Sequence, residues 1–393
     1  MEKKKYIDLF SGCGGLSLGF FNSKRWQGVF AVEKDTFAFE TLQHNLIDNR
    51  SHFAWPDWLT KSNHDIKEVL NSKEDKLASL EGTVDLITGG PPCQGFSMAG
   101  RRESSDHRNE LVLSYLETIK LVKPKVIFFE NVEGFTLPFT KDGDRRFSNE
   151  VEKELHELGY TAKGQLVDFS DYGVPQRRKR YIIVGFAEGV ATGKNFFEEL
   201  DKQRDGFLKK KGLASKVSIK DAISDLERKH GTYDIKKDRF KYGKYGTSTG
   251  AYQQYVRGEL VVTPDSHRFA NHTLDIEVRL KEIIADKLNT SKAVRERFNL
   301  KKSSIKLLQA AECSPTLTTL PDDYVHYSEP RILTVREYAR IQSFNDWFEF
   351  KGKYTTGGHL RTKQVPRYSQ IGNAIPPLFA ELCAETIDRL LNE

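Results

Sequence analysis

Short hydrophobic runs alternate with amphipathic segments over residues 1 to about 185. The short runs predict strands at residues 5–9, 28–32, 84–88, 125–129, 164–167 and 181–185. The amphipathic segments predict helices at residues 36–45, 111–121 and 149–158. This alternation is typical of an α/β fold with a doubly wound, mostly parallel sheet that is covered by helices on both faces. We expect the last two strands to be antiparallel to each other at one edge.

The regular pattern weakens after residue 186. Residues 187 to about 315 are rich in lysine and interrupted by glycines, and one longer helix is predicted there, from residue 274 to about 289. Regular patterning returns at residues 334–343, where Thr334 and Glu337 have the spacing of a helix capping box. A last helix is predicted at residues 376–391.

This pattern favours two domains. The larger is expected to combine residues 1–186 with about 360–393, and the smaller to span residues 187–359. The net charge of +6 supports the division, because residues 187–315 carry 26 Lys and Arg against 18 Asp and Glu, a net charge of +8. Such a basic segment indicates a module that faces a polyanion, although a lysine-rich solvated surface is the alternative.

Composition excludes several other classes of protein. With 30% charged and 11% aromatic residues, the chain of 393 residues fits a folded globular protein. No apolar run approaches the roughly 20 residues that a membrane helix needs, and the start lacks the apolar segment of a secretory signal. The four cysteines, at positions 13, 93, 313 and 383, are too scattered for a disulfide framework or a CxxC metal site. We therefore expect a cytoplasmic protein without a membrane segment or a metal.

A glycine-rich turn follows the first predicted strand, with glycines at positions 12, 14, 15 and 19. A strand, a glycine-rich turn and a helix form the nucleotide-binding corner of doubly wound folds, although packing glycines would give the same pattern. Glu33 ends the second strand, where a carboxylate would bind ribose hydroxyls. Asp65 follows His64 at the expected end of one further strand, which would be the third in chain order and make those at 84–88 and 125–129 the fourth and fifth, and there it would meet an adenine ring. Together these residues favour a cofactor that contains a nucleoside.

Cys93 lies in a loop beyond the strand that ends at Thr88, at the end of the sheet where open α/β folds place their sites. Pro91 and Pro92 stiffen the approach to it. A lone cysteine is more often a small buried hydrophobic residue than a nucleophile, but the polar and glycine neighbours of Cys93 weaken that interpretation. Residues 94–109 are polar and basic, as suits a loop that closes over a phosphate backbone.

Two further groups of polar residues stand next to predicted strands. Glu130 ends the fifth strand, after two phenylalanines, and is a candidate proton donor. The basic residues of 176–180 precede the last strand, where alone they would be a solvated face.

Taken together and in this order, the motifs resemble those of the DNA (cytosine-5)-methyltransferases. The resemblance rests on the glycine-rich turn of residues 8–20, Glu33, Asp65, Pro91-Pro92-Cys93-Gln94, Glu130-Asn131-Val132, Gln176-x-Arg178-x-Arg180, residues 336–342 and Gly372-Asn373-Ala374. It spans both ends of the chain, and Ala374 stands where some members have serine. Residues 187–315 match no family pattern in detail, as expected where the target-recognition region lies.

The resemblance implies methyl transfer from S-adenosylmethionine to carbon 5 of a cytosine flipped out of duplex DNA. Cys93 would add to carbon 6, Glu130 would stabilise the ring at nitrogen 3, and Arg180 would hold the exocyclic oxygen. Arg178 would support the pocket or bind a phosphate.

The resemblance also implies binding residues. Those for the cofactor are Phe10, Gly12, Gly14, Glu33, Asp65, Ile66, Pro92, Leu111, Asn373 and Ala374. Those for DNA are Gln94, Ser97, Arg101, Thr316 and Leu317.

Several alternatives remain open from the sequence. A closely related scaffold acts on tRNA, but the long middle segment favours DNA, because reading a sequence in the major groove requires a recognition module. A non-catalytic nucleic-acid binder is disfavoured by intact Cys93, Glu130 and Arg180. An NAD-dependent oxidoreductase would leave the Pro91-Pro92-Cys93-Gln94 and Glu130-Asn131-Val132 motifs unexplained. We expect a bacterial modification enzyme that acts as a monomer near the nucleoid, with a possible cognate restriction endonuclease that forms no stable complex with it.

Overall fold

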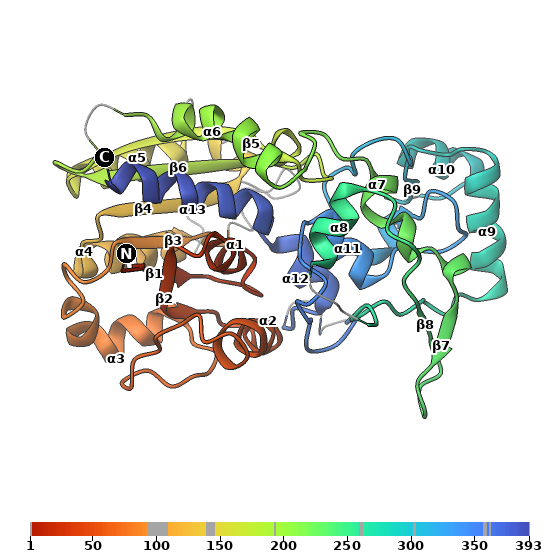
Figure 1. Ribbon diagram of the computed structural model, residues 1–393, viewed down its shortest axis with the longest axis horizontal. Coiled ribbons are helices and arrows are strands. Elements are labelled where there is room, and N and C mark those ends of the chain that lie inside the picture. Colours follow the sequence, from red (N-terminus) through yellow and green to blue (C-terminus); the bar gives the residue numbers. More distant parts are fainter. Residues whose placement is uncertain are drawn as a thin grey trace. The chain divides into compact units, whose positions relative to one another are not determined.

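The chain divides into two compact units in a computed structural model that describes residues 2–92, 109–138, 146–191, 194–258, 262–301, 304–356, 360 and 363–392 (Figure 1). The first unit comprises Met1–Phe169, Lys179–Asp205 and Phe379–Glu393, and the second comprises Ser170–Arg178 and Gly206–Leu378. From the sequence, we expected boundaries at residue 186 and at about residue 360 between a catalytic domain and a DNA-recognition domain. This assignment of roles to two domains stays a prediction.

The first unit is built on a six-stranded sheet with the order β2-β1-β3-β4-β6-β5 (Figure 1). Its strands are β1 (Lys4–Leu9), β2 (Trp26–Val32), β3 (Leu86–Gly89), β4 (Val126–Val132), β5 (Tyr160–Asp168) and β6 (Lys179–Ala187). The first four are parallel to one another, and β6 is antiparallel to both β4 and β5. This arrangement confirms the mostly parallel sheet and the antiparallel pair at its edge.

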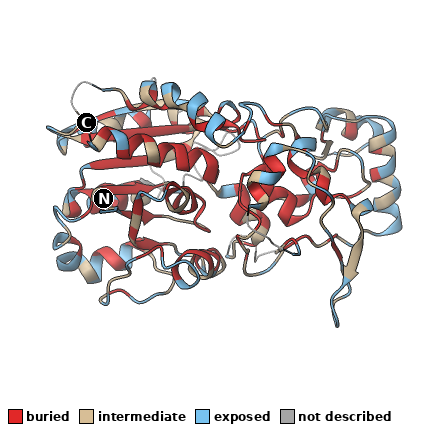
Figure 2. Cartoon of the chain, viewed as in Figure 1, coloured by how far each residue is buried: buried red, intermediate tan, exposed pale blue. Residues whose placement is uncertain are grey.

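Successive residues of β1 face opposite layers of the first unit, as the period of a strand requires. Ile7 and Leu9 belong to a core cluster that they share with residues of α3 (Ile66–Ala78), α4 (Asn109–Val122) and α5 (Phe147–Glu157). Tyr6 packs instead on Phe20 of α1 (Gly15–Ser23), with ring centroids 4.8 Å apart. Figure 2 shows the strands of this sheet as largely buried.

The two ends of the chain meet in the first unit. α13 (Pro377–Asn392) lies along the sheet, where its Ala384 carbonyl accepts a 3.0 Å hydrogen bond from the Trp26 indole. Lys4, at the start of β1, forms a 2.6 Å ion pair with Asp388 of the same helix. Strand β1 and helix α13 therefore stabilise each other although they stand at opposite ends of the sequence.

One sequence-based strand is wrong. Residues 54–65 form turns and irregular backbone rather than a strand that ends at His64. The segment is held instead by local hydrogen bonds, among them one of 2.7 Å from the His64 N–H to the Glu33 carbonyl. Asp65 is the N-cap of α3, and its carboxylate accepts the Lys67 N–H at 3.0 Å. The strand before Cys93 is therefore the third of the sheet, not the fourth.

The helices differ from the sequence prediction mainly after residue 186. α6 (Phe196–Lys210) was not expected. The helix expected at residues 274–289 is α9 (Leu274–Ala285), which ends somewhat earlier, and α10 (Ser291–Phe298), which Thr290 caps through its hydroxyl, was not expected. In the first unit, α2 (Thr36–Leu42) continues as a π-helical segment, η1 (Gln43–Asp48).

The second unit contains short helices around a core that includes buried charges. α7 (Ile219–Ile223), α8 (Ala251–Arg257), α11 (Val335–Ile341) and α12 (Arg367–Asn373) are joined by long loops and by two small two-stranded sheets. One sheet pairs β7 (Thr232–Asp234) with β8 (Lys241–Gly243), and the other pairs β9 (Lys306–Leu307) with β10 (Tyr324–Val325). Helix α11 begins at the expected capping box, in which Glu337 accepts the Thr334 N–H at 2.7 Å.

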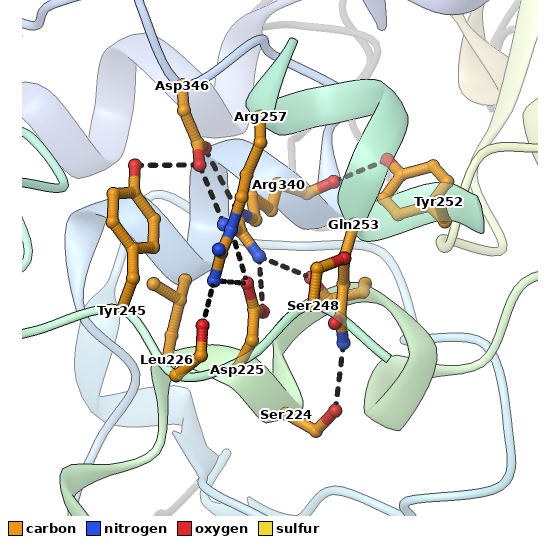
Figure 3. Close-up of polar contacts among 12 residues, drawn as sticks. Ser224, Asp225, Leu226, Tyr245, Ser248, Tyr252, Gln253, Arg257, Arg340 and Asp346 are labelled. Carbon is orange, nitrogen blue, oxygen red and sulfur yellow. Dashed lines mark hydrogen bonds and ion pairs between the residues drawn. The ribbon is translucent and has the colours of Figure 1, made fainter. Parts of the chain in front are cut away.

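Arg340 of α11 and the partly buried Arg257 of α8 meet in one cluster of ion pairs (Figure 3). Arg340, fully buried, forms ion pairs of 2.6 Å with Asp346 and 2.5 Å with Asp225. Arg257 contacts the same Asp225 at 2.5 Å. Because a buried charge without a partner is strongly destabilising, each of these groups depends on the others. The residues of the 336–342 motif therefore hold the second unit together.

Within the described residues, no helix is both long enough and apolar enough to cross a membrane.

Candidate active site

The glycine-rich turn after β1 has a backbone that few side chains tolerate. Phe10, Gly12 and Gly14 have φ angles of 58°, 55° and 89°, in the left-handed region. The Gly14 N–H donates to the Ser11 carbonyl at 2.9 Å, and the Ser11 N–H donates to the Val32 carbonyl at 3.1 Å. The turn is therefore closed on itself and tied to the end of β2.

Glu33 fixes the same turn from the neighbouring strand. Its carboxylate accepts the Gly12 N–H at 2.9 Å and the Asp35 N–H at 2.7 Å. Burial raises the pKa of Glu33, and these two N–H donors oppose that rise. A carboxylate so placed has lone pairs left for hydroxyl groups of a ligand beside the turn.

A backbone hydrogen bond brings Asp65 near Glu33, because the N–H of the preceding residue, His64, donates to the Glu33 carbonyl. Its carboxylate forms a 2.7 Å ion pair with Lys34. Burial alone would raise the pKa of Asp65, but the hydrogen bonds from Lys34 and from the Lys67 N–H lower it on balance. The next residue, Ile66, is 3% exposed and belongs to the core cluster under the sheet.

Glu130 and Arg180 meet at the ends of two adjacent strands. In the antiparallel pairing of β4 with β6, Glu130 lies opposite Ile182, and Arg180 lies opposite Val132. The two side chains are diagonal neighbours, with Nε of Arg180 2.9 Å from Oε1 of Glu130. Burial lowers the pKa of Arg180, and the charge of Glu130 opposes that effect. The pair thus presents a carboxyl and a guanidinium side by side.

The backbone that leads toward residue 93 is held against this pair. A β-carbon on Gly90 would stand 2.7 Å from Oε2 of Glu130, so only glycine fits without a shift. The buried Asn131 side chain donates a 3.3 Å hydrogen bond to the Pro91 carbonyl. Sequence reasoning gave neither residue a role, although Gly90 adjoins the two prolines and Asn131 stands within a recognised motif.

The structure places Pro92 and Leu111 on either side of a segment that it does not describe. Pro92 is exposed, and Leu111, near the start of α4, is half-buried against the core cluster that Phe10 also contacts. Cys93, Gln94, Ser97 and Arg101 lie outside the described residues.

Four motif segments that are distant in sequence meet in the second unit. Gln176 accepts the Leu317 N–H at 2.9 Å through its side-chain oxygen, and its amide nitrogen donates to Gln342. Gln342 in turn donates to the Ala374 carbonyl at 2.8 Å. A β-carbon on Gly372 would meet the Thr318 carbonyl at 2.8 Å. The residues around 176, 317, 342 and 373 therefore form one packed cluster.

The remaining predicted residues of this cluster differ in exposure. Arg178 is 2% exposed and Leu317 is 1% exposed, so both are packed inside the unit. Thr316 is exposed and its hydroxyl donates to the Arg177 carbonyl at 2.8 Å. Asn373 is exposed at the end of α12, and Ala374 is half-buried.

Among the described residues, no three or more His, Cys, Asp or Glu side chains gather into a cluster that could hold a metal ion. The titratable groups that the described sheet brings together are instead a carboxyl and an arginine. Such a pair can hold a polar heterocycle and supply a hydrogen bond or a proton, and the nearby turn can hold a second ligand.

Comparison with known proteins gives consistent matches over the whole chain. The family model described as C-5 cytosine-specific DNA methylase matches residues 4–389. Type II methyltransferase M.PspPI of Psychrobacter is 32% identical over 391 residues, which cover 98% of this chain and 79% of that protein. Type II methyltransferase M.DdeI of Desulfomicrobium norvegicum is 28% identical over 390 residues, with 97% and 88% covered.

Solved structures share the fold. A putative DNA modification methyltransferase encoded within an Escherichia coli prophage aligns over 100% of both chains, with a TM-score of 0.68 and 24% identity. The Dnmt2 methyltransferase of Schizosaccharomyces pombe aligns over 99% of both chains, with a TM-score of 0.56 and 16% identity. At these identities the two structures are evidence for the fold alone.

Proposed function

Because the chain belongs to the C-5 cytosine-specific DNA methylase family, we propose that it methylates carbon 5 of a cytosine flipped out of duplex DNA, through a covalent bond from Cys93. Its family and relatives make it a DNA cytosine-5 methyltransferase of the type found in restriction–modification systems. The finer steps rest on the residues. The observation that carries them is the ion pair of Glu130 and Arg180 beside the backbone that leads to Cys93.

The chemistry explains why this pair is needed. Carbon 5 of cytosine is a poor nucleophile, so the Cys93 sulfur first forms a bond to carbon 6 and pushes electron density into the ring. Glu130 donates a hydrogen bond or proton at ring nitrogen 3, and Arg180 binds the exocyclic oxygen. Carbon 5 then carries enough electron density to take a methyl group. Loss of the carbon-5 proton and cleavage of the carbon–sulfur bond restore the aromatic ring.

None of these contacts is possible inside a base stack, and enzymes that act on a base rotate it out of the duplex. In this proposal the cytosine is flipped toward the pair. Gln94, Ser97 and Arg101, which lie outside the described residues, would contact the DNA behind it. DNA contacts are also proposed for Thr316, which is exposed, and for Leu317, whose buried side chain would have to become exposed on DNA binding. Arg178, which is buried, would support the pocket from within.

The turn after β1 fits S-adenosylmethionine. A β-carbon on Gly12 would meet no atom within 4 Å, so the space beside the turn is open. The Ser11 hydroxyl is buried and has no hydrogen-bond partner among the described residues, as suits a group that binds a polar ligand. When bound, the cofactor supplies an electrophilic methyl group.

The residues that would hold the cofactor follow from the turn and the family motifs. Glu33 would bind the ribose hydroxyls, Asp65 the adenine amino group, and Ile66 the ring. The remaining contacts are assigned to Phe10, Gly12, Gly14, Pro92, Leu111, Asn373 and Ala374.

The relatives are named as Type II methyltransferases, which supports a proposal for the biological setting. We infer that the protein acts on double-stranded DNA in the bacterial cytoplasm as a monomer. In this setting it protects sites from a cognate restriction endonuclease that it does not bind stably.

The test is bisulfite sequencing of DNA from a methylation-free host that expresses the protein. Protected cytosines at one recurring sequence are the expected result. Host DNA that stays fully convertible, while the purified protein is folded, would contradict the proposed function.

A further inference from the structure

The β7–β8 ribbon, residues 232–243, projects from the second unit (Figure 1). Its strands pair Thr232 with Gly243, Tyr233 with Tyr242, and Asp234 with Lys241. Residues 235–240 connect them, and within this tip Ile235, Lys236 and Lys237 are exposed. Figure 2 shows the ribbon as intermediate to exposed along most of its length.

The tip of the ribbon carries positive charge that its own acids do not neutralise. Asp234 forms a 2.7 Å ion pair with Lys241, and Asp238 accepts a 2.6 Å hydrogen bond from the Tyr242 hydroxyl. Among the described residues, no carboxylate lies within ion-pair distance of Lys236, Lys237 or Arg239. The ribbon therefore presents three cations to solvent.

The root of the ribbon is fixed by the neighbouring segment of residues 267–271. The Phe269 N–H donates to the Lys241 carbonyl at 2.9 Å, and the Gly243 N–H donates to the His267 carbonyl at 2.9 Å. The Arg268 guanidinium lies over the rings of Phe240 and Tyr354, at 3.9 Å and 3.5 Å from their centroids. A fixed root with an exposed tip loses little conformational entropy when it binds a partner.

The tip is also held in its backbone. The Asn271 side chain donates a 3.1 Å hydrogen bond to the carbonyl of Arg239. The Phe240 N–H donates to the Asp238 carboxylate at 3.1 Å. These bonds fix the backbone around the cations. The Arg239 guanidinium lies 5.1 Å from the centroid of the Phe240 ring, and the exposed side chains of Lys236 and Lys237 extend into solvent.

The dimensions of the ribbon match one groove of DNA. A major groove is about 12 Å wide and about 8.5 Å deep and admits a two-stranded ribbon, whereas an undistorted minor groove, about 6 Å wide, would have to be widened first. The two ladder steps from Thr232 to Asp234 extend roughly 7 Å, and the tip lies beyond them. We propose that the β7–β8 ribbon enters the major groove of the substrate DNA, with Lys236, Lys237 and Arg239 as its contacts.

This proposal rests on the proposed function and assigns the sequence-reading element within the second unit. The three cations would have different tasks. The flexible lysines suit phosphates, which every sequence shares, whereas the planar fork of Arg239 suits the N7 and O6 atoms of a guanine. By contrast, the exposed face of α9 carries Leu274, Ile276 and Val278, which offer nothing to a polyanion.

The test compares a double variant, K236Q/K237Q, with a control, K281Q/K292Q, that removes the same charge from exposed positions of α9 and α10. Binding to a methylatable duplex and to an unrelated duplex is measured from 50 to 200 mM salt. K236Q/K237Q is expected to weaken both complexes at least tenfold and to lower the salt slope by up to about 1.8. The control should bind like the wild type.

Arg239 gives the second readout. R239Q is expected to reduce the discrimination between the two duplexes roughly 10- to 100-fold, as loss of one bidentate base contact does. Wild-type binding by both ribbon variants, or an equal loss in the control, would overturn the proposal. Methyl transfer is assayed separately. A wild-type protein that binds DNA through the ribbon but transfers no methyl group would refute the proposed function and leave the ribbon assignment standing.

Discussion

The Nε atom of Arg180 lies 2.9 Å from Oε1 of Glu130, and the two side chains are 14% and 13% exposed. This partial burial strengthens the pair relative to a surface ion pair, while it leaves access for a ligand. The antiparallel pairing of β4 with β6 fixes both groups, so a flipped base meets two polar groups that need little reorganisation.

The first prediction concerns Glu130. Glu130→Gln keeps the shape of the side chain but removes the proton that the carboxyl can donate. We expect kcat for methyl transfer to fall by about 10²- to 10⁴-fold, with DNA and cofactor affinities close to those of the wild type. Single-turnover transfer of labelled methyl groups measures this. Glu154→Gln, at an exposed position of α5, is the matched control, and an equal loss there would refute the assignment.

The second prediction concerns the space in front of Glu130. Gly90→Ala would place a β-carbon 2.7 Å from Oε2 of Glu130 and must displace that carboxyl. We expect at least a tenfold loss of kcat with a small change in melting temperature, because the strain is local. Gly206→Ala, in α6, has no atom within 4 Å of the new methyl group and should leave activity unchanged. Full activity of Gly90→Ala would show that the position of Glu130 is not critical.

The third prediction concerns the cofactor. Glu33→Gln replaces a charged acceptor of the Gly12 N–H and of the ribose hydroxyls by a neutral one. Hydrogen bonds to charged groups contribute about 1.5–3 kcal/mol, so we expect affinity for S-adenosylmethionine to fall roughly 10- to 100-fold. Isothermal titration calorimetry measures this. Glu40→Gln, exposed on α2, should bind as the wild type does, and unchanged affinity in Glu33→Gln would count against the cofactor site.

The fourth prediction concerns pH and Asp8, which is buried between β1, β3 and α1. Its carboxylate accepts hydrogen bonds from the hydroxyls of Ser17, at 2.5 Å, and Thr88, at 3.1 Å. Burial raises the pKa of Asp8 to about 7, against about 3.9 in an unfolded chain. Between these values the folded protein holds a proton that the unfolded chain releases. The stabilisation from this proton is complete below about pH 4 and is lost as the pH rises through 7.

Asp8→Asn should remove this dependence. The free energy of unfolding, measured by urea titration from pH 5 to 8, is expected to fall for the wild type relative to the variant, by at most about 1.4 kcal/mol per pH unit. His52 titrates in the opposite sense, because burial lowers its pKa to about 3, but it is present in both proteins and cancels in the difference. Parallel curves for the two proteins would contradict the prediction.

The sequence predicts the sheet well because its buried strands are runs of β-branched and aromatic residues between turn signals. The capping box at Thr334 was predicted for a similar reason, since both of its residues act locally. The strand expected before Asp65 failed because residues 54–65 are held by contacts with Glu33 and Gly28, which local pattern does not encode. Helix α6 was missed because it lies in the lysine-rich segment, where charged residues obscure its apolar face.

In the candidate site, too, some residues could be predicted from the sequence and others could not. Glu33 and Glu130 could be predicted because each lies at or near the carboxyl end of a strand, where open sheets place their ligands. The dependence of Glu130 on Gly90, and of Pro91 on Asn131, could not, since both contacts join separate strands at atomic distance. Residues 336–342 belong to a recognised motif, yet Arg340 proved to be a structural residue of the second unit.

Trapping on modified DNA tests for the covalent bond between Cys93 and carbon 6 of the target cytosine. Duplex DNA that contains 5-fluorocytosine at the methylated position cannot lose its carbon-5 substituent as a proton, so the enzyme should stay bound. With S-adenosylmethionine present, the wild type is expected to form an adduct that survives denaturing electrophoresis, and peptide mass spectrometry should place the DNA on Cys93. Cys93→Ser should form none. A wild-type enzyme that methylates ordinary DNA but forms no adduct, or a Cys93→Ser variant that methylates normally, would contradict the account.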